Sequence, residues 1–126
     1  MEIVSAEQGR ATLTMPFLIE FAQGAGLMHG GALVSLADTA VAMAIKSVLP
    51  PQTHFVTVAM ESRFLRPVTQ GVITAKAQVS QKTGRKFQGQ AIVYDPAGKP
   101  VLDFACTFKV AKERGIRLPY KINFVW

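Results

Sequence analysis

The strongest constraint in this sequence of 126 residues is one long apolar run, from Ala32 to Leu49, that contains a single acid. The run has no proline or glycine before Pro50, and its apolar residues would lie on nearly every side of a helix. This pattern is typical of a buried helix rather than of a surface amphipathic one. The run is short and interrupted by Asp38, which argues against a membrane span. The sequence therefore predicts a buried helix that carries a carboxylate.

An acid such as Asp38 is unusual in a buried helix. An unpaired buried carboxylate destabilises the fold or is forced to bind a proton. Three other polar residues of the run would share its helix face: Ser35, Thr39 and Lys46. One interpretation is a structural acid, satisfied by hydrogen bonds or by a basic partner across an interface. The other is a carboxylate with a raised pKa that acts as a general base or a nucleophile.

A Gly-Gly pair, Gly30 and Gly31, stands at the expected start of this helix. The first amides of a helix have no partner within the helix and carry the positive end of its dipole. Because glycine has no side chain, a substrate carbonyl can approach these amides closely. Amide donors for an oxyanion, together with a carboxylate on the same helix, are the groups that hydrolysis of an acyl compound requires.

Composition narrows the class of ligand and of site. Fourteen basic and eight acidic residues give a formal charge of +6, without the dense basic run of a nucleic-acid-binding protein, so a phosphorylated small molecule is favoured. The one cysteine, Cys106, lies in a strand-like pattern and is expected to be a core thiol. The two histidines, His29 and His54, have no metal-ligand spacing, so no metal site is expected. No secretory signal is evident, which favours a cytoplasmic protein.

Most of the remaining chain has the two-residue periodicity of strands. Strands are expected at residues 2–6, 10–15, 55–65, 72–81, 86–94 and 101–110. In the third of these, alternation places Val56, Val58, Met60 and Phe64 on one face and Thr57, Glu61 and Arg63 on the other. The four strands that follow the helix are expected to form a meander whose apolar face the helix covers. The chain is thus predicted to be one α+β domain over residues 1–126, with a tail of uncertain structure at 113–126.

Four short motifs resemble those of hotdog-fold acyl-CoA thioesterases, in particular the phenylacetyl-CoA thioesterase-like branch. They are the G-x-x-H-G-G-A motif of residues 26–32, the L-A-D-x-A motif of residues 36–40, the F-L-R-P strand end of residues 64–67 and the Gly84–Arg85 turn. The resemblance implies an antiparallel sheet wrapped around one long central helix. It also implies a homodimer or homotetramer with active sites between subunits, and no cofactor, since coenzyme A is part of the substrate.

The resemblance also implies roles for individual residues. Asp38 would be the catalytic carboxylate, and the Gly30 amide would polarise the thioester carbonyl. His29 would shape the turn before the helix, or only cap the helix. Gln23 stands where relatives usually have an asparagine that holds the water or the carbonyl, and Thr57 matches a hydroxyl residue that often assists the acid.

Gly31 would also contact the substrate, and coenzyme A would bring its phosphates to basic side chains on the surface. The candidates are Arg63, Arg66, Arg85 and Lys86. Each is alternatively an ordinary solvated charge. The thiol carrier is either coenzyme A or an acidic carrier protein, since a +6 chain suits both.

Two other functions remain open at this point. A non-catalytic acyl-CoA-binding or sensor protein would have the same fold, and the presence of Gln23 in place of asparagine keeps this hypothesis in view. A hotdog dehydratase is less consistent with the spacing between His29 and Asp38, because that group pairs a histidine and an acid differently.

Overall fold

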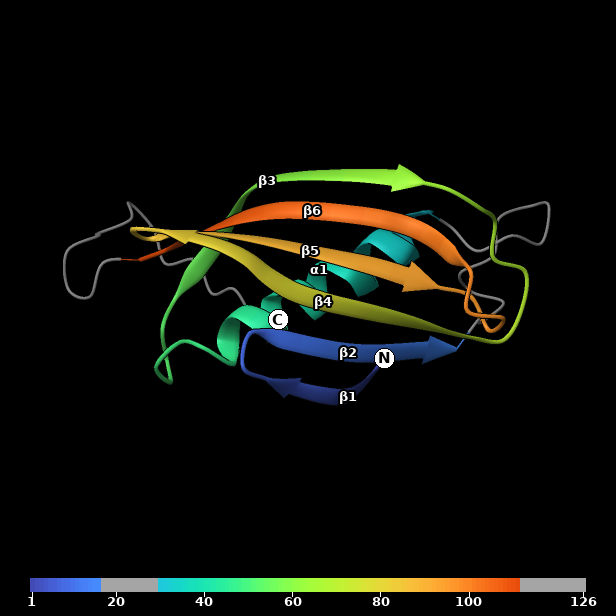
Figure 1. The fold of residues 1–126 in the computed structure, drawn as a ribbon, viewed down its shortest axis with the longest axis horizontal. Coiled ribbons are helices and arrows are strands. Elements are labelled where there is room, and N and C mark those ends of the chain that lie inside the picture. The colour runs from blue at the N-terminus through green and yellow to red at the C-terminus, as the bar shows by residue number, and fades with distance from the viewer. Residues whose placement is uncertain (17–29, 112–126) are drawn as a thin grey trace.

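The computed structural model describes residues 1–16 and 30–111. In chain order its elements are β1 (Glu2–Glu7), β2 (Arg10–Pro16), α1 (Gly30–Lys46), β3 (Phe55–Phe64), β4 (Val72–Thr83), β5 (Lys86–Tyr94) and β6 (Pro100–Val110) (Figure 1). The buried helix and every expected strand are present. The tail at 113–126 lies outside the described residues. Within the described part of the chain, no helix is both long and apolar enough to cross a membrane.

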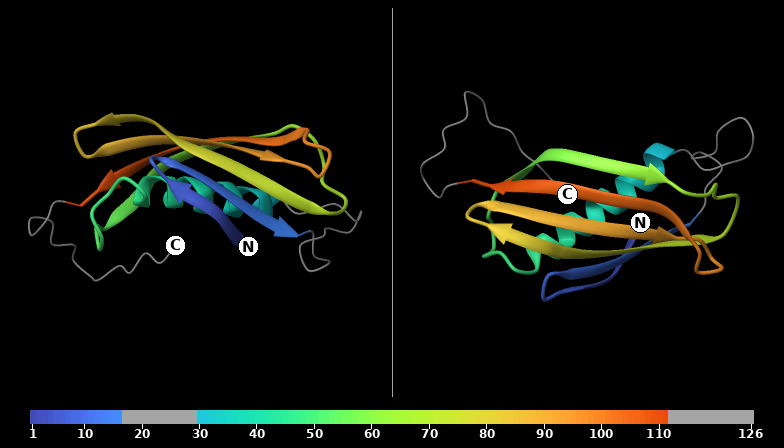
Figure 2. Two further views of the ribbon diagram at one scale, coloured as in Figure 1. Left: turned by 60° about the horizontal axis from the view of Figure 1, so that its bottom comes forward. Right: turned by 45° about the horizontal axis from the view of Figure 1, so that its top comes forward.

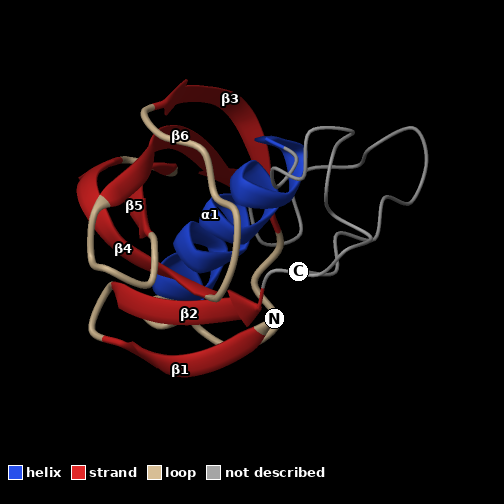
Figure 3. Cartoon of the chain, turned by 90° about the vertical axis from the view of Figure 1, so that its right-hand side faces the viewer, coloured by secondary structure: helices blue, strands red, loops and turns tan. Residues whose placement is uncertain are grey.

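All neighbouring strands are antiparallel and form one sheet in the order β1-β2-β4-β5-β6-β3. The sheet curves over α1, which runs along its concave side (Figure 2). Seen from one end, the strands surround much of the helix (Figure 3). This is the hotdog arrangement, and it confirms the predicted fold class.

The position of β3 differs from the predicted meander. β4 pairs with β5 on one side and with β2 on the other, so neither of its edges is available to β3. β3 instead pairs with β6 and forms one edge of the sheet, which makes the connection between β3 and β4 a crossover. The meander prediction was wrong because it did not include the pairing of β2 with β4.

A β-bulge in β3 also overturns the predicted faces of that strand. Thr57 lies opposite Phe108 and Met60 lies opposite Cys106, with a shift in register between Thr57 and Ala59. Phe108 and Cys106 both point to the helix side of β6, where they are buried. Thr57 and Met60 therefore share the helix-facing side, because the bulge inserts one extra residue and reverses the alternation.

The core lies between α1 and the concave side of the sheet, where the helix packs chiefly against β2, β4, β5 and β6. Many of the residues at this interface are small, which lets the helix lie close to the strands. They include Ala37, Ala40 and Ala44 of α1 and Ala75, Ala77 and Ala91 of the sheet, all buried. β3 projects beyond the helix, so Met60 is 51% exposed and Phe64 54% exposed although both face inward.

Ser47 ties the C-terminal end of α1 to the turn between β1 and β2. Its Oγ donates to the Ala44 carbonyl at 2.6 Å and accepts from the Gly9 amide at 2.8 Å. The Gly9 carbonyl in turn accepts from the Val79 amide at 2.8 Å. One hydroxyl thus connects the helix to the turn that β4 also holds, and fixes where α1 ends along the sheet.

Candidate active site

Asp38 is a buried carboxylate whose charge has no evident compensation. The residue is 4% exposed, and its Oδ1 has no hydrogen-bond partner among the described residues. Burial raises the pKa of this carboxyl from its ordinary value of 3.8 to about 6, since water no longer stabilises the charged form. The group is therefore mostly ionised at neutral pH while its oxygen remains available. Within the described residues of one subunit, no hydrogen bond satisfies Oδ1, and a basic partner across an interface remains the structural alternative.

Cys106 identifies the part of the sheet that lies over Asp38. Burial, and secondarily the Asp38 charge, raise the pKa of this thiol to about 12, because both disfavour the thiolate. The thiol is therefore protonated at neutral pH and suits the predicted core role rather than a nucleophilic one. Cys106 pairs with Met60 of β3 and Gly89 of β5, so the charge of Asp38 acts near this row of the sheet.

The start of α1 is packed against the far end of β3. Gly30 is the first residue of the helix, and a Cβ there would lie 2.8 Å and 2.9 Å from the Phe64 Cε1 and Cζ atoms. A side chain at Gly30 would therefore have to move the Phe64 ring. A Cβ at Gly31 would have no atom of the described residues within 4 Å. The helix start thus has the Phe64 ring on one side and is open at Gly31.

Thr57 is brought to the inner side of β3 by the bulge. Its Oγ1 is buried and has no hydrogen-bond partner among the described residues. Both Thr57 and Asp38 thus offer a buried, unpartnered oxygen on the side of the sheet that faces α1. An unpaired buried hydroxyl lowers the stability of the fold, which makes Thr57 a candidate functional residue.

The four basic candidates for coenzyme A binding lie at two opposite ends of the subunit. Arg63 and Arg66 are at the Phe64 end. Arg63 lies opposite Asp103 in the register of β3 and β6, and the Arg66 amide donates to the Val101 carbonyl at 3.4 Å. Arg85 and Lys86 are at the other end, where the Arg85 carbonyl accepts from Val110 at 2.8 Å. One subunit therefore does not bring the four together. The Nη1 atom of Arg85 is buried without a partner among the described residues.

Two predicted site residues, Gln23 and His29, lie outside the described residues. Among the described ones, no group of three or more His, Cys, Asp or Glu side chains is placed to hold a metal ion.

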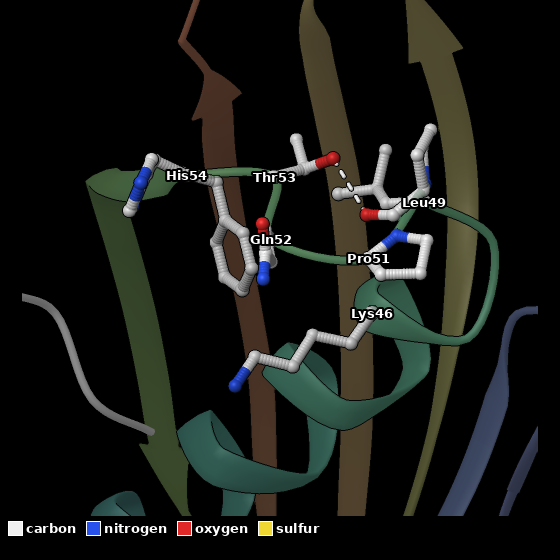
Figure 4. Close-up of a pocket in the computed structure, with 8 residues that line it drawn as sticks. Lys46, Leu49, Pro51, Gln52, Thr53 and His54 are labelled. Carbon is white, nitrogen blue, oxygen red and sulfur yellow. Dashed lines mark hydrogen bonds between the residues drawn. The ribbon is translucent and has the colours of Figure 1, made fainter.

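A surface hollow of about 330 Å³ lies at the end of α1 opposite to Gly30. Lys46 and residues 49–55 line it, and the Thr53 hydroxyl donates to the Pro50 carbonyl at 2.6 Å within its wall (Figure 4). Of the predicted catalytic residues that the structure describes, Gly30, Asp38 and Thr57, none lines this hollow. Its volume alone does not make it the site.

Sequence reasoning missed Gly89 and the proximity of Cys106 to Asp38. An isolated glycine inside an alternating strand often marks a close approach of another segment, and that signal was present in the run Lys86–Tyr94. The neighbourhood of Cys106 depends also on the pairing of β6 with β3, which are far apart in the chain, and no local pattern specifies that pairing.

Comparison with known proteins gives a consistent result. The family model of the thioesterase superfamily matches residues 25–102. A 1,4-dihydroxy-2-naphthoyl-CoA hydrolase of Listeria monocytogenes is 31% identical over 90% of this chain and 93% of its own length. The acyl-coenzyme A thioesterase PaaI of Escherichia coli is 39% identical over 75% of this chain and 63% of its own. A Saccharolobus solfataricus protein named as an esterase is 29% identical, over 65% of this chain, which spans 58% of that relative's length.

Solved structures support the same fold. The Escherichia coli PaaI protein has a TM-score of 0.81 and 31% identity, over 88% of this chain and 79% of that one. A conserved protein of Pseudomonas aeruginosa has a TM-score of 0.83 and 28% identity, over 87% of each chain.

The raised pKa of Asp38 predicts how stability depends on pH. The folded state binds a proton at Asp38 more tightly than the unfolded state, so the free energy of unfolding falls as pH rises from about 3.8 to about 6. Asp38→Asn removes the titrating carboxyl group, and with it this fall in the free energy of unfolding. We expect the variant to gain about 2.5 kcal/mol relative to wild type between pH 4 and pH 8, since one unit of pKa corresponds to about 1.4 kcal/mol and part of the loss already occurs below pH 4. Urea unfolding of both proteins at equal concentration measures it.

The difference between the two proteins isolates Asp38, because all other titrating groups are common to both. A difference that stays constant from pH 4 to pH 8 would show that the carboxyl titrates at its ordinary value.

Proposed function

We propose, from the premise that this chain belongs to the thioesterase superfamily, that it hydrolyses acyl- or aryl-CoA thioesters to the free acid and coenzyme A. The two relatives named above for their reactions both act, by those names, on coenzyme A thioesters. The observation that carries the proposal is the buried Asp38, whose Oδ1 has no partner in the described residues and whose pKa of about 6 leaves it ionised at neutral pH. A structural acid needs neither property.

In the proposed reaction, the Asp38 carboxylate takes a proton from water, which attacks the thioester carbon. An N–H group at the start of α1, that of Gly30, donates to the carbonyl oxygen as negative charge develops there. The C–S bond breaks, and the coenzyme A thiolate leaves and takes up a proton. Direct attack by Asp38 on the thioester carbon, followed by hydrolysis of the anhydride, uses the same groups.

These two groups cannot serve the same thioester within one subunit. Asp38 follows Gly30 by eight residues of a continuous helix, which separates them by about 12 Å along its axis. The attacking atom and the polarised carbonyl must instead meet around a single carbon, within about 3–3.5 Å. A complete site therefore needs Gly30 from one subunit and Asp38 from another.

The free edge of β3 supplies a route to such a dimer. No strand pairs with this edge among the described residues, and apolar side chains are exposed along and just beyond β3. They are Val56, Val58, Met60, Phe64 and Leu65. An exposed apolar edge strand favours pairing with another chain. Pairing of β3 with its copy across a two-fold axis would continue the sheet from one subunit into the next.

The position of that axis follows from the levels of the two groups. Gly30 lies at the level of Phe64, and the charge of Asp38 acts near the row of Cys106 and Met60. An axis midway between these levels, near Ser62, brings the Asp38 of one subunit to the level of Gly30 of the other. The same rotation carries the partner's Arg85 and Lys86 to the end of the sheet that holds Arg63 and Arg66. We propose that this end receives the phosphates of coenzyme A.

The first experiment measures thiol release from a panel of acyl- and aryl-CoA thioesters. We expect the wild type to release thiol and Asp38→Asn to lose at least 100-fold in kcat, because the amide cannot accept the proton. Gly30→Pro removes the N–H donor at a helix position that tolerates proline. Its control, Gly30→Ala, adds a Cβ in the same place against Phe64 but keeps the amide, and is expected to retain at least tenfold more activity.

Wild-type kcat in Asp38→Asn would contradict the role of Asp38. Tight binding of acyl-CoA by a folded wild type that releases no thiol would instead favour the acyl-CoA sensor.

A complementation experiment tests the shared site. Asp38→Asn and Gly30→Pro chains are mixed, unfolded in urea and refolded together. Half of the dimers are then mixed, and each mixed dimer has one site with both groups intact. We expect recovery of up to a quarter of wild-type activity from two inactive parents. If both groups came from the same subunit, each site would keep a defect and the mixture would stay inactive.

A further inference from the structure

At Gly89 of β5 a side chain of α1 lies directly against the backbone of the sheet. A Cβ added there would overlap the Val41 Cγ1 atom, with Val41 Cβ at 3.6 Å and the Gln78 carbonyl oxygen at 3.5 Å. Gly89 does not have a positive φ, unlike four other glycines of the described residues. Space, and not backbone conformation, therefore requires glycine at this position. The Val41 side chain occupies the volume that any side chain at residue 89 would need.

This contact lies within one helical turn of Asp38. Val41 follows Asp38 by three residues, so the two side chains point to neighbouring parts of the same helix face. Gly89 pairs with Cys106, the residue of β6 whose thiol is affected by the charge of Asp38. Val41, Gly89, Cys106 and Asp38 therefore form one group, which we call the helix seat.

Packing at the helix seat sets how deep the Asp38 carboxylate lies in the core. Asp38 Oδ1 accepts no hydrogen bond from the described residues, so no donor fixes its position. The neighbouring residues of β5 on the same face, Phe87 and Ala91, are buried and apolar. Of the titratable groups in the described residues, Cys106 is the one whose pKa the charge of Asp38 raises, and its thiol is protonated at neutral pH. Depth in the core thus depends on the distance between the helix and the strands.

We infer that Gly89 is a positioning residue of the active site: by having no side chain, it lets Val41 seat α1 against β5 and so holds the Asp38 carboxylate where it acts. This inference rests on the proposed function for its effect on turnover. Its effect on the surroundings of Asp38 follows from the contacts alone. Residue 89 touches no substrate in this account and acts only through the helix.

The test is Gly89→Ala, assayed for thiol release and for the pH dependence of kcat. The added methyl group pushes α1 outward, so we expect kcat to fall at least tenfold with KM changed less than threefold. The acid limb of the pH profile should move below 6, because a shallower Asp38 is better hydrated. Adding Val41→Ala removes the overlapped methyl group, and the double variant should return to within threefold of the wild-type kcat.

Two controls separate positioning from a general loss of stability. Gly98→Ala, in the β5–β6 hairpin, strains a backbone with φ of 82° but has nothing within 4 Å of the new Cβ. It should lower the unfolding midpoint and leave kcat and the pH profile as in the wild type. If Gly89→Ala alone does not fold, Val41→Ile, which adds one methylene from the helix side, tests the same spacing and should lower kcat.

Wild-type kcat and pH profile in Gly89→Ala, or a loss that Val41→Ala does not reverse, would overturn the inference. Failure of the proposed function is a separate result, because wild type itself would then release no thiol. In that case the pKa of Asp38, followed by carbon-13 NMR of its carboxyl group, remains a direct test. It should fall from about 6 toward 3.8 in Gly89→Ala and return in the double variant.

Discussion

The close packing of α1 against the curved sheet is the interaction on which the rest of this structure depends. Small side chains on both surfaces, and a glycine in β5, allow the helix to lie deep among five strands. This packing removes Asp38 from water and raises its pKa, with no donor in the described residues to compensate. The fold therefore stores an unfavourable charge where a proton acceptor is useful. In the proposed function, stability and activity oppose each other at this residue, as is common at active sites.

The edge strand β3 adds the second constraint. Its inner side chains extend past the helix and remain exposed, and its outer edge lacks a partner in the described residues. The helix geometry places Gly30 and Asp38 too far apart to act on one thioester. Both features support the proposed arrangement, in which two subunits join through β3 and share each site. In that proposal, a monomer could not bring Gly30 and Asp38 to one thioester.

Local patterns predicted much of this molecule. The buried helix, its acid, the glycine pair at its start and all six strands follow from hydrophobic periodicity and turn residues near in sequence. The position of β3 does not follow from such local patterns, because it depends on the pairing of β2 with β4, which are far apart in the chain. The face of Thr57 depends on a bulge that simple alternation hides. The importance of Gly89 becomes visible only once Val41 lies over it. Gln23 and His29 lie outside the described residues, and their roles stay predictions.

The central claim is that a deeply buried, ionised Asp38 drives thioester hydrolysis. The most direct measurement is the pH dependence of kcat/KM for thiol release by the wild type on its best coenzyme A thioester. A base must lose its proton to act, so activity should rise with pH through a single acid limb near 6 and then level off. An acid limb near 4, or no acid limb between pH 4 and pH 8, would contradict the account, because the acting group would then not be the buried Asp38 described here.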